Sequence, residues 1–197
     1  MADSNYRYEF RVWAANSAEL GEKLGGLGTP TRSISKETYL ISTATDRCNA
    51  KIRSALMDIK ILIAEERGLE QWKPVLKASF PLEQAVVATQ VFPSLGLKAP
   101  PLSRTQYSID QFFGEVVAAQ KAIAVAQVTK TRLQYALDAC QAEFASVIVN
   151  EIALDTMAFE STDPEAVLKL IADFGLDAGS NTSYVRQIKR VLGLTAK

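Results

Sequence analysis

The 197-residue sequence contains no histidine. This absence excludes Ser-His and Cys-His nucleophile pairs, the HExxH zinc motif and an imidazole general base. Any catalysis must therefore use carboxylates, lysine, arginine, tyrosine, or a metal ion held by oxygen ligands. Oxygen ligands favour magnesium, manganese or calcium over zinc.

The sequence is also poor in cysteine and has no long apolar run. Cys48 and Cys140 lie far apart without a CxxC spacing, which predicts reduced thiols and a cytoplasmic location. No segment approaches the roughly 20 apolar residues that a membrane span needs. The opening residues, MADSNYRYEF, lack the apolar core of a signal peptide. We therefore expect no membrane partner.

Net charge is absent as well, because 22 acidic residues balance 22 basic ones. This balance predicts no attraction to duplex nucleic acid and leaves room only for a local basic site. Apolar residues make up 48% of the chain, enough to bury a core. The length suits a single domain spanning 1–197. The sequence carries no signal for a particular oligomeric state.

What the sequence does contain is alternation of charged and apolar residues. Arg7, Glu9 and Arg11 alternate with Tyr8 and Phe10. Successive side chains of a strand point to opposite faces, so this segment places three charges on one face. The same alternation recurs at three later places, Lys51 and Arg53, Asp58 and Lys60, and Lys130 and Arg132. Strands that share this pattern predict a common polar interior or groove.

Period-2 patterning and turn residues locate the elements of secondary structure. We predict strands at 6–13, 37–43, 49–54, 56–64, 75–80, 122–136, 141–149 and 154–161. We predict helices at 17–24, 82–92, 108–119, 163–175 and 183–192. Pro74 is expected before a strand and Pro93 after a helix, and the alanine-rich stretch 118–127 could equally stay helical.

Seven to nine sequential strands favour an α+β fold. In it an antiparallel sheet closes, or nearly closes, into a β-barrel with peripheral and C-terminal helices, because closure removes the sheet edges. An interior lined by arginine, lysine and glutamate needs water, an anion or metal ions to satisfy its charges.

The order of the charged strands resembles the CYTH domain, the family of triphosphate tunnel metalloenzymes. The family's opening Glu-x-Glu-x-Lys strand is similar to Arg7, Glu9 and Arg11, with only the middle acid kept. Its Arg-x-Arg strand resembles Lys51-Ile-Arg53, and the next strand, which ends in lysine, resembles 57–60. Further matches are Lys130-Thr-Arg132-Leu-Gln-Tyr135, the acidic Cys140-Gln-Ala-Glu143 and the late Ala158-Phe-Glu160. The helix at 183–192 is similar in place to the family's C-terminal helix.

The resemblance implies a charged tunnel that binds a triphosphate-bearing small molecule or a polyphosphate with a divalent cation, Mg²⁺ or Mn²⁺. It implies that three carboxylates are metal ligands and catalytic groups, namely Glu9, Glu143 and Glu160. It implies phosphate binding by Arg11, Lys51, Arg53, Lys60, Lys77, Lys130 and Arg132. Arginine and lysine suit this role because triphosphates carry several negative charges, and arginine binds them with two parallel hydrogen bonds.

Two residues depart from the family pattern. Arg7 stands where the opening motif has its first acid, and Ala158 stands where the late Glu-x-Glu has its first acid. Both changes weaken metal binding, and we expect Arg7 to form a salt bridge with Glu9 that competes with the metal. Asp58 is expected at a turn or on the surface, with a role as a ligand as the alternative.

Four functions come into consideration, and the first is favoured over the second. The first is a divergent metal-dependent phosphohydrolase that acts on a triphosphate-bearing substrate, a possible triphosphatase. The second is a non-catalytic module of the same fold that binds polyphosphate or a nucleotide. An adenylate cyclase, which the family also contains, gains no support because no adenine-recognising feature stands out. A structural domain without a small-molecule site is the fourth alternative.

Overall fold

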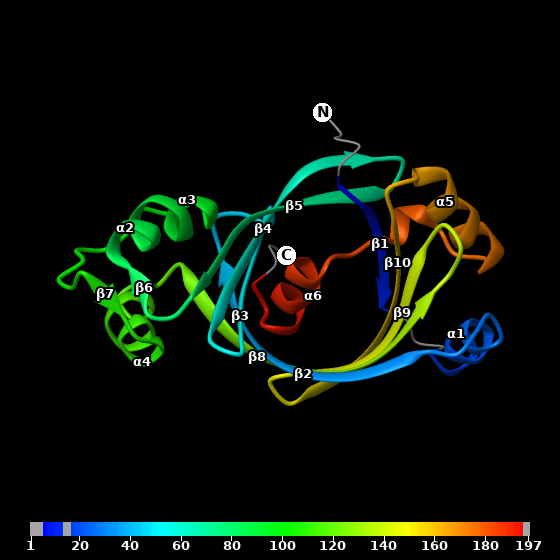
Figure 1. The fold of residues 1–197 in the computed structure, drawn as a ribbon, viewed down its shortest axis with the longest axis horizontal. Coiled ribbons are helices and arrows are strands. Elements are labelled where there is room, and N and C mark those ends of the chain that lie inside the picture. The colour runs from blue at the N-terminus through cyan, green and yellow to red at the C-terminus, as the bar shows by residue number, and fades with distance from the viewer. Residues whose placement is uncertain (1–5, 14–16, 195–197) are drawn as a thin grey trace.

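The computed structural model describes residues 6–13 and 17–194. Its main feature is a closed antiparallel barrel in which the strands follow the order β1-β10-β9-β8-β2-β3-β4-β5 and β5 pairs back with β1 (Figure 1). The strands are β1 Tyr8–Trp13, β2 Thr31–Ser42, β3 Cys48–Arg53, β4 Leu56–Glu66, β5 Leu69–Ser79, β8 Ile123–Ala136, β9 Gln141–Val149 and β10 Ile152–Ser161. The predicted α+β barrel is thus confirmed.

Alternation along each strand divides the side chains between the interior and the outer surface. In β3, Cys48, Ala50 and Ile52 are buried in an apolar cluster outside the barrel, whereas Asn49 and Lys51 line its cavity. The period of two that was read from the sequence is therefore what places the charges inside.

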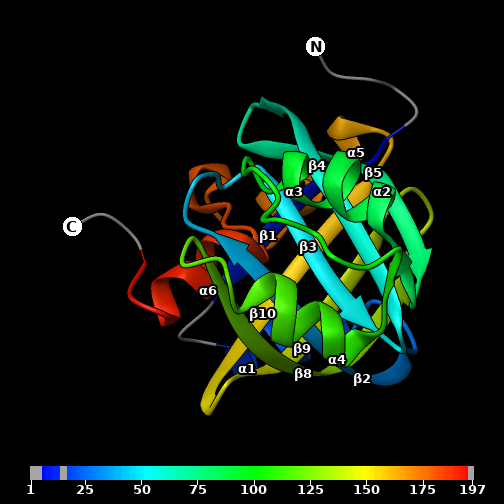
Figure 2. The same ribbon diagram turned by 90° about the vertical axis from the view of Figure 1, so that its left-hand side faces the viewer.

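Helices cover two sides of the barrel. On one side lies a continuous helical run made of α2 Gln84–Val86, the π-helical Val87–Val91 and α3 Phe92–Ser94. With it lie α4 Ile109–Gln111, the π-helical Phe112–Val117, and the short strands β6 Leu82–Glu83 and β7 Gln106–Tyr107 (Figure 2). Their apolar side chains pack on the outward residues of β3, β4 and β5.

The opposite side carries α1 Ser17–Gly25 and α5 Pro164–Asp173, which pack on β1, β9 and β10 (Figure 1). Asp163 caps α5 and Pro164 occupies its first turn, as the sequence predicts. Among the helices of the described residues, none has the length and apolar character needed to cross a membrane.

The last helix, α6 Tyr184–Val191, lies within the outline of the ring of strands (Figure 1). Tyr184 and Ile188 pack against inward residues of the barrel, including Tyr39, Ile41 and Val147. Ser183 caps the helix. Figure 2 shows α6 at one end of the barrel, so the helix closes that end and turns Tyr184 and Ile188 toward the interior.

Several boundaries differ from the prediction. Strand β2 begins at Thr31 and β5 begins at Leu69, each six residues earlier than expected. Pro74 lies inside β5, where the register jumps so that Lys60 faces Pro74 and Ile59 faces Leu76. This irregularity, typical of a β-bulge, accommodates a residue that cannot donate to the ladder. Pro93 lies within α3.

The structure also shows which conformation the alanine-rich stretch 118–127 adopts. Strand β8 begins at Ile123, so residues 123–127 are extended and not helical. The prediction of one domain spanning 1–197 stays a prediction.

We predict that Ile188→Ala destabilises the barrel because Ile188 is fully buried between α6 and the inward face of the strands. The free energy of unfolding in urea should fall by about 3 kcal/mol. The matched control is Ile34→Ala, since Ile34 is 64% exposed on β2. A fall of the same size in both variants would contradict the placement of α6.

Candidate functional site

The barrel interior holds a cavity of about 480 Å³. Charged side chains of both signs line it, with basic residues from β1, β3, β4 and β8. The basic members are Arg11, Lys51, Lys60, Lys130 and Arg132, and the acidic members are Glu9, Asp58, Glu70, Glu143 and Glu160. The lining therefore holds equal numbers of basic and acidic side chains.

Five of the seven basic residues implied by the resemblance thus converge on one space. The other two do not line it. Arg53 lies at the end of β3, where its guanidinium is 3.3 Å from a carboxylate oxygen of Glu37. Lys77 lies near the end of β5 and is exposed. Their phosphate-binding roles stay predictions that the geometry does not favour.

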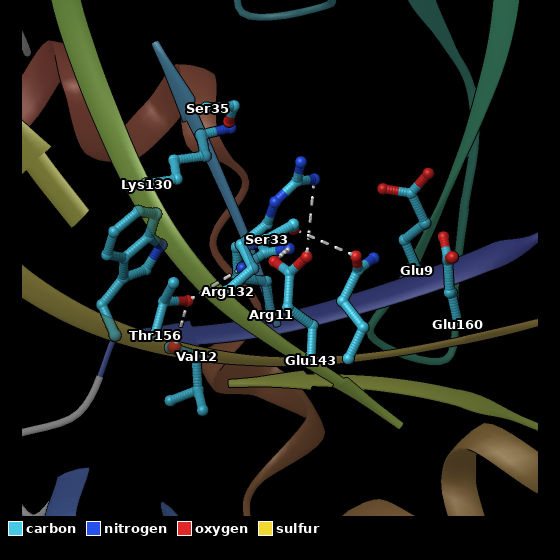
Figure 3. A network of polar contacts seen from close by, with 12 residues as sticks. Glu9, Arg11, Val12, Ser33, Ser35, Lys130, Arg132, Glu143, Thr156 and Glu160 are labelled. Atoms are coloured by element: carbon cyan, nitrogen blue, oxygen red, sulfur yellow. Dashed lines mark hydrogen bonds and ion pairs between the residues drawn. The ribbon is translucent and has the colours of Figure 1, made fainter. Parts of the chain in front are cut away.

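The three carboxylates implied as metal ligands all line the cavity, and each has a basic partner. Glu143 is 3.1 Å from Arg11 and 3.9 Å from Arg132, between which it lies in Figure 3. Glu9 is 3.0 Å from the ammonium group of Lys60. Glu160 is 2.7 Å from Arg7. The salt bridge of Arg7 is therefore made to Glu160, and the expectation that Arg7 would pair with Glu9 was wrong.

This arrangement does not fit a divalent cation. Across 6–13 and 17–194, no three acidic or cysteine side chains gather closely enough to hold a metal ion. Ala158, which faces both Arg11 and Glu143 across the strands, contributes only a methyl group at this point. The carboxylate oxygens that would bind metal are instead engaged by guanidinium and ammonium groups.

Glu37 is the most enclosed acid of the barrel, and sequence reasoning missed it. Its carboxylate has no exposed surface and lies 2.8 Å from the ammonium group of Lys130 and 3.5 Å from that of Lys51. The Tyr39 hydroxyl donates to it at 3.0 Å. Burial alone would raise the pKa of Glu37, but Lys130 and Lys51 lower it to about 2. Glu37 thus remains ionised at neutral pH and compensates a group of buried cations.

Lys130 is the cation most affected by its surroundings. Its side chain is 4% exposed, and its ammonium group donates to the Tyr39 hydroxyl at 2.7 Å. Burial and the neighbouring Lys51 lower the pKa of Lys130 to about 7, against the opposing effect of Glu37. Its charge therefore changes near neutral pH, in a cavity without histidine.

A second row of acids crosses neighbouring strands. Glu9 on β1 faces Glu160 on β10 and Glu70 on β5 in the register of the sheet. Figure 3 shows the carboxylates of Glu9 and Glu160 beside one another. Burial raises the pKa of Glu70, and burial followed by the negative charge of Glu9 raises that of Glu160. Like charges in such a row repel one another, so their basic partners are needed to hold them together.

Asp58 was expected at a turn or on the surface, and this expectation was wrong. It is 7% exposed and lines the cavity opposite Lys51. One of its oxygens belongs to a group of four buried polar atoms without a hydrogen-bond partner among the described residues. The four are Asn49 Oδ1, Asp58 Oδ1, Arg132 Nε and the Tyr184 hydroxyl. All four residues line the same cavity. Because buried polar groups are normally paired, this concentration is typical of a binding site.

Two solved structures with a similar fold show how far the likeness extends. A Hippeastrum protein described as a putative adenylyl cyclase, HpAC1, with a dominant triphosphatase activity, aligns over 94% of this chain and 95% of its own. The TM-score is 0.53 and the sequence identity 13%. A conserved hypothetical protein from Pyrococcus furiosus aligns over 91% of this chain and 98% of its own, with a TM-score of 0.51 and 15% identity. The chain thus shares the fold of these two proteins, in agreement with the closed barrel that the resemblance to the triphosphate tunnel proteins implies.

No protein-family model and no curated protein matches the sequence. The tunnel fold is thus shared without close sequence similarity, and the site must be argued from its own side chains. The sequence pattern predicted the basic residues of the cavity because most of them belong to pairs of charged residues two positions apart. Glu37 and Tyr184 lie outside such pairs, and Glu70 lies in the part of β5 that was expected to be a loop.

We predict that Glu37→Gln lowers the free energy of unfolding at neutral pH by about 3 kcal/mol, because it leaves buried cations uncompensated. The pKa of Glu37 falls from 4.5 to about 2 on folding. A depressed pKa gives stability that is present above the unfolded value and lost as pH falls through the folded value. The difference between wild type and variant should therefore shrink as pH decreases from about 4.5 toward about 2.

Urea unfolding at a series of pH values measures this difference. Glu115→Gln is the control, because Glu115 pairs with Arg104 on the exposed surface. A Glu37→Gln penalty that does not depend on pH would contradict the assignment.

Proposed function

We propose that the protein binds a triphosphate-bearing small molecule or a polyphosphate inside the barrel. The observation that carries this proposal is the convergence of five basic side chains from four strands on one cavity. Phosphate chains present many acceptor oxygens and several charges, which guanidinium and ammonium groups bind with strong hydrogen bonds. The dominant triphosphatase activity in the description of the Hippeastrum protein supports a triphosphate ligand.

The balance of charge in the cavity shapes how such a ligand binds. In the protein without a ligand, Glu143 pairs with both Arg11 and Arg132, and Glu9 pairs with Lys60. A phosphate group must replace these carboxylates at the cations, so binding is an exchange of anions. Arg132 Nε and the Tyr184 hydroxyl have no hydrogen-bond partner among the described residues, so a phosphate group that reaches them breaks no hydrogen bond there.

We predict that Arg132→Met weakens the binding of tripolyphosphate by about 10- to 100-fold, since it removes a charged donor from the cavity. Lys77→Met removes the same charge from an exposed position outside the lining and should bind as the wild type does. Isothermal titration calorimetry with the same ligand measures both. Equal losses in the two variants would indicate non-specific attraction and not a site in the cavity.

Hydrolysis of the bound phosphoanhydride is the second candidate function. The observation that favours it is the pair of facing carboxylates, Glu9 and Glu160, with the pKa of Glu160 raised by burial and by Glu9. Perturbed carboxylates in a cavity are candidates for acid–base work. Phosphate release from tripolyphosphate, ATP and thiamine triphosphate, measured with Mg²⁺ or Mn²⁺, tests this function. A folded sample that releases none would exclude it.

Glu143→Gln tells whether the anion binds with or without a divalent cation. If the carboxylate only occupies Arg11 and Arg132, its neutralisation frees both guanidinium groups, and tripolyphosphate should bind several-fold more tightly in EDTA. If Glu143 holds a divalent cation that the ligand needs, the same variant should bind more weakly in the presence of Mg²⁺. Calorimetry of wild type and variant, each with EDTA and with Mg²⁺, gives the answer. We expect the tighter binding.

The proposed ligand is an anion with a phosphate chain, and duplex nucleic acid and membranes are not part of the proposal. The proposal includes the cytoplasmic location that the two cysteines predict. Cys48 and Cys140 are both free and buried, which agrees with reduced thiols.

A further inference from the structure

The segment before α6 is bound to the strand that carries Arg11. The backbone N–H of Arg11 donates to Asn181 Oδ1 at 2.9 Å, and its carbonyl accepts from the Thr182 N–H at 2.8 Å. Strand β1 pairs with β5 only at Tyr8 and Glu9. Beyond Glu9, residues 181–182 therefore take the place of β5 as the hydrogen-bond partner of β1. These bonds fix the start of α6 beside the Arg11 backbone.

The rest of α6 is fixed to other parts of the barrel. Arg186 binds the carboxylate of Glu70 on β5 at 2.8 Å, and Lys189 donates to the Thr45 carbonyl at 3.0 Å between β2 and β3. Val185 packs against Leu62 and Trp72. The helix thus joins β1 to β4, β5 and the β2–β3 loop, and its first residue, Tyr184, is held in one place.

The ring of Tyr184 contacts two of the tunnel cations. The ammonium nitrogen of Lys130 lies 3.7 Å from the ring centroid, and the guanidinium carbon of Arg11 lies 4.5 Å from it. Trp13 meets the ring edge-on at 5.0 Å. An aromatic ring attracts cations most strongly where water is excluded, and Tyr184 is 8% exposed. The ring therefore attracts both cations in addition to their carboxylate partners and helps to fix where they lie.

The hydroxyl of Tyr184 is buried and has no hydrogen-bond partner in the part of the chain that the structure describes. Burial raises its pKa, so it keeps its proton at neutral pH and can act as a donor. It belongs to a residue that lines the cavity together with Arg132, whose Nε is also unpartnered. Both donors belong to residues of one cavity lining, and a phosphate chain that displaces the carboxylates around them would bring acceptor oxygens to both.

We propose that Tyr184 positions the ligand in this cavity, its ring holding Lys130 and Arg11 in place and its hydroxyl donating a hydrogen bond to the bound anion. The proposal rests on the proposed function, because it takes the anion to be a phosphate chain. It makes the C-terminal helix part of the binding site as well as of the core.

The test compares Tyr184→Phe and Tyr184→Leu with the wild type by calorimetry, with tripolyphosphate as ligand and EDTA in the buffer. Tyr184→Phe keeps the ring and loses the hydroxyl, so its affinity should fall by about tenfold. Tyr184→Leu also loses the contact with the two cations and should bind more weakly still. Tyr107→Phe is the matched control, since Tyr107 is a buried tyrosine outside the cavity.

The pH dependence of binding gives a readout that a merely structural role would not move. The pKa of Lys130 is about 7, and its ammonium form is the one that binds an anion. The charged and titratable groups that face it are Glu37 and Tyr39 on β2, Lys51 on β3, Arg11 on β1 and Tyr184 on α6. Of these groups, Tyr184 alone differs between the wild type and the two Tyr184 variants. Loss of the ring removes an interaction that favours the charged lysine, so the Lys130-dependent decrease in affinity should begin at lower pH in Tyr184→Leu. Tyr184→Phe should follow the wild-type profile.

The outcomes separate this inference from the function on which it rests. Wild-type binding together with an unchanged affinity of Tyr184→Phe overturns the role of Tyr184 and leaves the proposed function standing. Absence of binding by the wild type overturns both. If Tyr184→Leu does not fold, the Tyr184→Phe affinity decides alone, with Tyr107→Phe showing what loss of a buried hydroxyl elsewhere does.

Discussion

Charge buried in the interior of a protein must be paired, and the barrel is organised around that constraint. Lys130 and Glu37 form its most enclosed pair, with side chains 4% and 0% exposed. Desolvating either ion alone would cost several kcal/mol (about 3 or more on removal of a partner). Lys51, Arg53 and Tyr39 share the same carboxylate, so strands β2, β3 and β8 are held together at this point. The apolar outer faces and their helices then enclose the polar interior.

The same constraint explains why the carboxylates of the tunnel are not arranged as a metal site. Each acid that the family resemblance implied as a ligand has taken a basic partner, and Arg7 binds Glu160 where the family has an acid. A cavity with equal numbers of acidic and basic residues is stable without a ligand, and its cations become available when an anion displaces the acids. Exchange of anions, and not attraction by net charge, is therefore the basis of the proposed binding.

Much of the fold could be predicted from the sequence, because alternation of charged and apolar residues directly encodes the two faces of a strand. The pairs Lys51/Arg53 and Lys130/Arg132 located the tunnel, and the caps Asp163 and Ser183 located two helices. The neighbouring sequence of a residue did not predict which side chains it contacts across the barrel. Arg53 and Lys77 fit the pattern but lie outside the cavity lining, since a position along a strand decides whether its side chain reaches the cavity.

Other residues of the site depend on tertiary structure in a different way. Glu70 was missed because β5 contains Pro74, which locally argues against a strand and is accommodated by the register jump. Tyr184 was missed because the sequence of an eight-residue amphipathic helix does not show that the helix closes one end of a barrel and that its first residue lines the cavity. Such residues become visible only when the closed sheet brings β1, β8 and α6 together.

A crystal structure of the protein with tripolyphosphate, grown without divalent cations, tests the exchange of anions most directly. The account predicts phosphate oxygens within hydrogen-bonding distance of Lys130 and Arg132, with the carboxylate of Glu143 displaced from Arg11. A barrel that keeps all its internal ion pairs, with tripolyphosphate bound only on the outer surface, would contradict it.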